Sequence, residues 1–189
     1  FDGSGDIYKI GAVCEAQGSS IGIVSQDTVV GGSWRVERRN MQYELIWAVN
    51  KPAPDPSFDH YEYGGCCVAD TLFMYTGGGL TSLFQTGPLV EKRRLSDGSA
   101  VWSLQSGTAP GLGGNQVFDL AVDANGLYCA TVYRSDFGAE NRQLEKRLLS
   151  TGAVSWGLVL NYTPVGIDID ETGIYFCGFN AQVQKRNFT

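Results

Sequence analysis

The residues best suited to acid–base chemistry lie together in one proline-rich stretch. His60, the single histidine of the chain, and the carboxylates of Asp59 and Glu62 fall within KPAPDPSFDHYEYGG, residues 51–65. A histidine can act as a general base, and a carboxylate pair can hydrolyse glycosides. However, no serine or cysteine of a nucleophile-elbow motif accompanies them, and loop carboxylates near prolines are usually only solvated. We therefore predict no catalytic residues, with a glycan-active enzyme as the less favoured alternative.

Residue types that hold metals and cofactors are also sparse. The five cysteines form no CxxC pair, and one histidine adds little to a zinc site. Because five is odd, at least one thiol lacks an intrachain disulfide partner, and the cysteines have the apolar or small neighbours of buried thiols. Asp119, Asp168 and Asp170 could hold a cation, but Asp123 and Asp170 occupy matching turn positions, which turn capping explains. We expect no metal and no cofactor.

The composition of the whole chain limits its partners. The 189 residues suffice for one well-packed domain, which we place at 1–189, and no apolar run is long enough to span a membrane. Twenty acidic against 14 basic residues give a net charge of −6. This charge repels phosphate backbones, so we expect no nucleic-acid partner.

Internal repeats indicate the architecture. LVEKRRLSDGSAVW at 89–102 and QLEKRLLSTGAVSW at 143–156 share one pattern, and Trp47, Trp102 and Trp156 recur about 54 residues apart. Before each motif comes an alternating run broken by a turn, such as VFDLAVDANGLYCATVY at 117–133, which is typical of a hairpin. Each unit thus predicts four short antiparallel strands.

Four such units predict an all-β fold, a β-propeller of four blades. The last unit lacks its turn and Trp, whereas the chain begins with Asp2-Gly3-Ser4, a copy of the Asp97-Gly98-Ser99 turn. We therefore expect the strand Asp6–Ile10 to pair beside Gln182–Phe188 and to close the ring. The alternative is a fragment of a larger propeller. The expected blades are about 19–50, 64–104, 116–160, and 164–189 completed by 1–13.

The repeats resemble a known family. RRLSDGSAVWSLQSGTAPGLGGNQVFDLAVDANGLYCATV at 93–132 resembles bacterial β-propeller repeats of the seven-bladed-propeller type, and STGAVSW at 150–156 is similar to quinoprotein-type repeats. The resemblance implies the fold alone, because propellers serve as enzymes, lectins and scaffolds alike. The bacterial repeats occur in many surface and secreted proteins, so the resemblance favours a secreted or cell-surface location.

Residues that recur in every unit are expected to serve the fold. The Trp column, with Tyr8 in the fourth place, predicts packing between blades rather than stacking platforms for sugars. Glu-x-Arg pairs such as Glu91-Arg93 and Glu145-Arg147 place both charges on one face of a strand. We expect these pairs to form cross-strand ion pairs at blade interfaces rather than a charged ligand ring.

Features of single units are free to serve function. Long loops at 51–65, 77–88, 105–115 and 133–141 surround the second and third blades and should emerge on one face. Aromatic and polar groups mixed on such loops predict an interaction surface, unless the loops only pack over the channel mouth. We predict a non-catalytic protein-interaction scaffold, with a carbohydrate-binding lectin as the alternative. The candidate binding residues are Phe58, Asp59, His60, Tyr61, Tyr63, Phe84, Arg134, Asp136 and Phe137.

Overall fold

The computed structural model describes residues 8–16, 20–27, 34–51, 60–81, 86–105, 115–134, 139–179 and 182–187. These residues form strands and turns, and none of them belongs to a helix long and apolar enough to span a membrane. The all-β prediction is therefore confirmed for the described part of the chain.

The strands of the first two units form two antiparallel sheets of four strands, each in chain order. Every strand pairs with the next one along the chain, as expected for strands joined by short turns. The first sheet contains β1 (Tyr8–Ala16), β2 (Ser20–Asp27), β3 (Trp34–Asn40) and β4 (Leu45–Lys51). The second contains β5 (His60–Ala69), β6 (Phe73–Thr81), β7 (Thr86–Arg94) and β8 (Ala100–Gln105).

The other two units repeat this arrangement, with one strand fewer described in the last. The third sheet contains β9 (Gln116–Asp123), β10 (Gly126–Arg134), β11 (Glu140–Arg147) and β12 (Val154–Leu160). The fourth contains β13 (Pro164–Asp170), β14 (Gly173–Gly178) and β15 (Gln182–Arg186).

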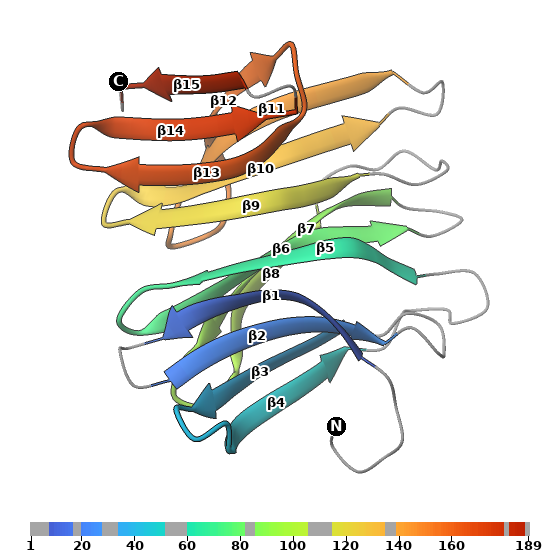
Figure 1. Cartoon of the computed structure of the whole chain (residues 1–189), viewed down its shortest axis with the longest axis vertical. Coiled ribbons are helices and arrows are strands. Elements are labelled where there is room, and N and C mark those ends of the chain that lie inside the picture. Colours follow the sequence, from blue (N-terminus) through green and yellow to red (C-terminus); the bar gives the residue numbers. More distant parts are fainter. Residues whose placement is uncertain are drawn as a thin grey trace.

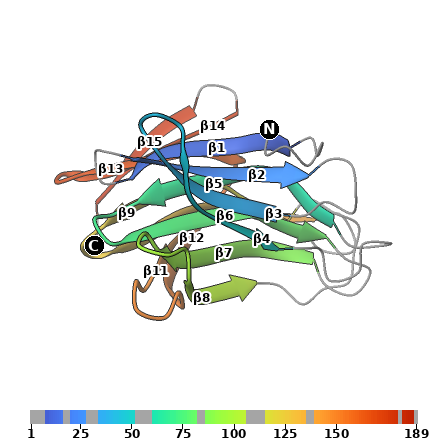
Figure 2. The ribbon, with the colours of Figure 1, turned by 90° about the horizontal axis from the view of Figure 1, so that it is seen from below.

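The four sheets stack in chain order, from β1–β4 at one end of the molecule to β13–β15 at the other (Figure 1). Their first strands β1, β5, β9 and β13 lie in succession, and each contacts the next. Figure 2, turned by 90°, views the stack from its β1–β4 end. This succession of antiparallel sheets, three with four described strands and one with three, is a β-propeller-like arrangement.

The N-terminal strand is not where the sequence placed it. Tyr8, Lys9 and Ile10 pair with Asp27, Gln26 and Ser25 of β2, so β1 is the first strand of the first sheet. The prediction that Asp6–Ile10 pairs beside Gln182–Phe188 is thus wrong for the three residues of it that the structure describes. The physical reason is continuity: β1 runs on to Ala16 and gains a full antiparallel partner in β2, its neighbour in the chain.

Aspartates end the first strand of three sheets. The Asp123 carboxylate accepts hydrogen bonds from the backbone N–H groups of Asn125 and Gly126, and the Asp170 carboxylate accepts them from Thr172 and Gly173. Asp70 makes the same two contacts in the second sheet. The predicted turn-capping role of Asp123 and Asp170 is confirmed, because these contacts satisfy backbone donors that the turn leaves unpaired.

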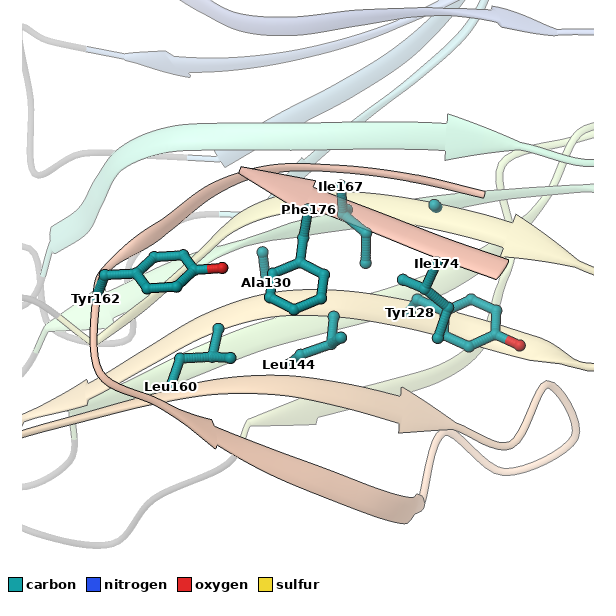
Figure 3. Packing of buried hydrophobic residues seen from close by; sticks show 9 residues of the cluster. Tyr128, Ala130, Leu144, Leu160, Tyr162, Ile167, Ile174 and Phe176 are labelled. Carbon is teal, nitrogen blue, oxygen red and sulfur yellow. The ribbon is translucent and has the colours of Figure 1, made fainter. Parts of the chain in front are cut away.

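Apolar side chains fill each space between neighbouring sheets. Between the third and fourth sheets, Leu144 of β11 and Tyr128 of β10 meet Ile174 and Phe176 of β14, and the Tyr162 ring stacks on Phe176 with a centroid separation of 6.3 Å (Figure 3). Two similar clusters lie between the other neighbouring sheets. An inner sheet is therefore buried on both of its faces.

Candidate interaction face

The predicted loops at 51–65, 77–88 and 133–141 are shorter than expected, because β5, β6, β7, β10 and β11 extend into them. The strand ends that border these segments lie at one end of the sheets. In the second sheet, His60 pairs with Thr81, and Thr81 pairs with Thr86 across the 82–85 loop. In the third sheet, Arg134 pairs with Glu140 across the 135–138 loop. The first strands of the sheets run in the same direction (Figure 1), so these ends share one face of the stack. We call this face the loop end.

The structure places part of the predicted binding site at the loop end. The backbones of His60, Tyr61 and Tyr63 belong to the start of β5, and the backbone of Arg134 ends β10. The sequence placed these four residues in loops, whereas the structure places their backbones in strands, and their role in binding stays a prediction. The other candidates lie outside the described residues: Phe58, Asp59, Phe84, Asp136 and Phe137.

The buried carboxylates of β7 and β11 are engaged within the protein. Glu91 accepts hydrogen bonds from Lys51 Nζ at 2.8 Å and from Ser103 Oγ at 2.7 Å, so it joins the first sheet to the second. Glu145 accepts a hydrogen bond from the Tyr133 hydroxyl. Because these oxygens are occupied by structural contacts, neither carboxylate is presented to a substrate.

The Glu-x-Arg pairs contact each other along the strand rather than across strands. Arg93 donates to Glu91 at 2.7 Å, and Arg147 donates to Glu145 at 2.6 Å, both pairs being buried between sheets. The expected cross-strand pairing is wrong for these pairs, because residues two apart on a strand share a face and their long side chains reach each other. The expected position at blade interfaces is confirmed.

The recurring Trp residues donate hydrogen bonds to the neighbouring sheet. Trp47 Nε1 donates to the Leu95 carbonyl at 2.8 Å, and Arg38 donates to the same oxygen at 2.7 Å. In the next pair of sheets, Trp102 Nε1 and Lys92 Nζ both donate to the Leu149 carbonyl, at 3.2 and 2.9 Å. The predicted role of Trp47 and Trp102 in packing between blades is therefore confirmed.

We call this pair of contacts the latch: a Trp and a basic residue of one sheet donate to one turn carbonyl of the following sheet. Sequence reasoning found the Trp but missed the acceptor, because a backbone carbonyl has no residue type to recognise. A second omission is Trp34, which lies buried among the core residues between the first two sheets and stands outside the repeated Trp column.

The aspartates considered for a cation have structural partners. Asp119 accepts hydrogen bonds from the backbone N–H groups of Leu120 and Ile167, both at 2.9 Å, and so joins β9 to β13. Burial raises the pKa of Asp119, which weakens it further as a metal ligand. Among the described residues, no three metal-binding side chains come together.

The two buried thiols, Cys66 and Cys129, are not disposed for nucleophilic chemistry. Burial raises the pKa of Cys129 to about 12 and also raises the pKa of Cys66, so both thiols stay protonated near neutral pH. A hydrogen bond between the thiols of Cys14 and Cys67 lowers the pKa of Cys14 and raises that of Cys67. All five cysteines are free in the structure.

Acid should weaken the junction at Glu91. Burial disfavours its charge, but the cations of Arg93 and Lys51 and the hydroxyl of Ser103 hold its pKa below the ordinary 4.5. The Glu91 carboxylate therefore takes up a proton less readily in the folded state than in the unfolded chain. The stability that Glu91 contributes is complete at pH values above its ordinary pKa, and it is lost as the pH falls through the lowered pKa of the folded state. We expect the melting temperature to fall more steeply between about pH 5 and pH 3 in the wild type than in Glu91→Gln. Equal slopes in calorimetric melts would contradict this role.

Comparison with known proteins identifies a fold and no family. No family model matches the chain, and no curated protein matches it. The computationally designed Ika4 protein superposes with a TM-score of 0.60 at 10% sequence identity, over 98% of this chain and 95% of that one.

Two natural proteins also superpose on the four sheets. BamB from Moraxella catarrhalis gives a TM-score of 0.52 at 13% identity, over 94% of this chain and 46% of that one. A protein of unknown function from Bacteroides caccae gives 0.53 at 7% identity, over 96% of this chain and 61% of that one. The chain thus spans less than two thirds of both natural proteins. At these identities the likeness shows a β-propeller-like fold and nothing about activity.

Proposed function

We propose that this chain is a non-catalytic binding module, a protein-interaction scaffold whose sheets are the blades of a propeller and whose loop end holds the partner. The observation that supports it best is the shared position of the strand ends bordering the loops at 52–59, 82–85, 106–114 and 135–138. Rigid sheets that present several variable loops on one face are a common way to build a binding surface.

The distribution of charged groups supports a scaffold over an enzyme. The best-buried carboxylates of the second and third sheets are Glu91, which is paired with Lys51 of the first sheet, and Glu145, which is paired with Arg147 of its own strand, and neither is presented to solvent. An enzyme needs an acid, base or nucleophile with reach to a substrate. The resemblance of the repeats to those of surface and secreted bacterial proteins adds an extracellular location to the proposal.

A carbohydrate-binding propeller is the second candidate. Aromatic residues at the loop end, such as Tyr61 and Tyr63 on β5, have the chemistry to stack on sugar rings. The recurring Trp residues do not favour it, because Trp47 and Trp102 are committed to the latch. A protein partner is favoured because the candidate residues spread over several loops.

The test replaces Tyr61, Phe84 and Phe137 together by Ser. We expect the far-UV circular dichroism and the melting temperature of the variant to stay close to those of wild type. Binding is measured to proteins recovered from the source and to an array of glycans, and the variant should lose whichever binding wild type shows. Which of the two probes binds wild type separates scaffold from lectin. A variant that retains binding would move the site away from the loop end, and a variant that unfolds would show that these aromatics pack over the sheets.

A further inference from the structure

The sheet at the C-terminal end of the stack has one face that no described strand covers. Val183 of β15 is 72% exposed, whereas the residues at the same position in the other three sheets, Val36, Val90 and Leu144, are all 0% exposed. The register defines the match, because Val183 lies opposite Cys177 of β14 as Leu144 lies opposite Ala130 of β10. In the other sheets this face packs against the following sheet. We call the Val183 side of β13–β15 the trailing face.

The sheet at the N-terminal end has the complementary face, which no described strand of another sheet covers, although Ile23 and Glu37 on it are buried. Val13 of β1 is 54% exposed, whereas its counterparts Leu120 and Ile167 are buried against the preceding sheet. The match again follows from register: Val13 lies opposite Ile23, as Leu120 lies opposite Cys129. We call the Val13 side of β1–β4 the leading face.

The basic donor and the carbonyl acceptor of the latch have counterparts on the two faces, whereas the described trailing sheet has no counterpart of the latch Trp. Lys185 on the trailing face lies over the Tyr175 ring, with Nζ 5.0 Å from its centroid, as Lys92 lies over Tyr75 in the second sheet. Its Nζ donates to the Thr172 hydroxyl at one sheet edge. The counterpart of the Leu95 acceptor on the leading sheet is Met41, two residues after Arg39 as Leu95 is two after Arg93. Leu95 is buried and Met41 is exposed.

From these faces we infer that two copies of the chain associate head to tail, with the trailing face of each on the leading face of the other, and close a ring. Each junction would use the strand positions that form the three interfaces inside the chain, except the fourth strand with its Trp, so the three described strands of the trailing face offer a matching pattern of apolar and basic groups. Val183 and Val13 become buried, and Lys185 donates to the Met41 carbonyl of the second copy. The contact is heterologous, and making it twice about a two-fold axis leaves no uncovered sheet face.

Larger propeller-like chains offer a precedent for a longer succession of sheets. The four sheets superpose on 46% of the BamB chain and on 61% of the Bacteroides caccae chain, so each of those chains extends beyond the part that matches these sheets. Rotation about the ring axis keeps both loop ends on one side, so the pair would present two loop ends together and bind a repeated partner with avidity. The association itself does not depend on what the loop end binds.

Sedimentation velocity of the purified full chain at micromolar concentrations tests the stoichiometry. We expect a single species with twice the 20.5 kDa mass of one chain. The mass of one chain, or a ladder of larger assemblies, would overturn the proposal.

Point variants test the two faces. We expect Val183→Glu and Val13→Glu each to weaken association on the order of a hundredfold or more, because each buries an unpaired carboxylate at a junction, and to leave the circular dichroism of one chain unchanged. Val159→Glu is the matched control, since Val159 of β12 is 68% exposed on an inner sheet. It should keep the double mass, and a control that dissociates as readily would overturn the assignment of the faces.

Mixing the two variants tests the direction of the contact. Val183→Glu chains keep an intact leading face and Val13→Glu chains keep an intact trailing face, so the mixture can form one unaltered junction. We expect the double mass to reappear in the mixture at a concentration where each variant alone has the mass of one chain. The head-to-tail arrangement would be overturned if the mixture does not recover the double mass. It would also be overturned if Val183→Glu dissociates the pair and Val13→Glu does not.

Discussion

Arg147→Met should lower the free energy of unfolding by about 3–5 kcal/mol, because it leaves the Glu145 carboxylate buried without its cation. The exposed fractions of the Arg147 and Glu145 side chains are 1% and 2%. Arg147 donates twice to one Glu145 oxygen, at 2.6 and 3.0 Å, and once to the Gly152 carbonyl in the turn after β11. The substitution therefore removes the ion pair with Glu145 and the hydrogen bond that holds the Gly152 turn between the second and third sheets.

The same strand supplies the control for this prediction. Arg142 donates to Glu140 at 2.6 Å with the same spacing of two residues, but both side chains remain in contact with solvent. Arg142→Met should cost no more than about 1 kcal/mol, since water replaces the lost contact. Urea denaturation at one protein concentration measures both values, and similar losses for the two variants would show that burial does not decide the effect.

The double variant Glu145→Gln, Arg147→Met separates charge from packing. If the buried carboxylate causes the loss, neutralising it should recover part of the stability of Arg147→Met. The recovery will be incomplete because the hydrogen bonds to Tyr133 and Gly152 are altered or absent. A double variant less stable than Arg147→Met would assign the loss to packing of the Arg147 side chain.

Trp34→Ala should destabilise the chain by about 3–5 kcal/mol, the usual cost of removing a large buried aromatic ring. Trp34 begins β3 and lies in the core between the first two sheets with Val24 and Met74. Its ring lies directly against Gly78 of β6, where an added Cβ would come within 2.2 Å of a ring carbon. The cavity cannot be filled from Gly78, because glycine has no side chain to rearrange.

Two further variants define the origin of this loss. Gly78→Ala should cost about 1–3 kcal/mol through overpacking against the Trp34 ring, and this penalty should disappear when Trp34 is already Ala. Leu72→Ala, at an exposed position in the turn before β6, should change stability by no more than about 0.5 kcal/mol. Urea denaturation followed by far-UV circular dichroism avoids the loss of Trp fluorescence. Additive losses for Trp34→Ala and Gly78→Ala would contradict their contact.

Local features of the fold could be predicted from the sequence. Alternating residues and Asp-x-x-Gly turns predicted the hairpins, and Asp123 and Asp170 make the turn contacts expected of them. The repetition of the motifs predicted four similar units, which the structure shows as four sheets. These predictions succeed because strand alternation and turn capping depend on neighbours within a few residues of the chain.

The candidate site could be predicted only in part from the sequence. The sequence overestimated the loops, because much of 77–88 and the ends of 51–65 and 133–141 belong to strands, and His60 and Arg134 lie in strands rather than in loops. The side chains of the candidate binding residues fall outside the part of the chain that the structure describes in detail, so their role stays a prediction. Loop conformation depends on contacts between segments far apart in sequence, which a repeat pattern does not encode.

The repeating unit could be read from the residues alone: a run of strands, its turns, its Trp and its Glu-x-Arg pair. The strand with which each unit begins became clear only from the pairing of strands in the folded chain. Tyr8–Ile10 matches the last strand of one unit by sequence, yet it pairs with Ser25–Asp27 as the first strand of another. A periodic sequence allows either choice, because both give the same local pattern, and backbone pairing between β1 and β2 selects one of them. That selection leaves Val13 and Val183 on uncovered faces at opposite ends of the stack.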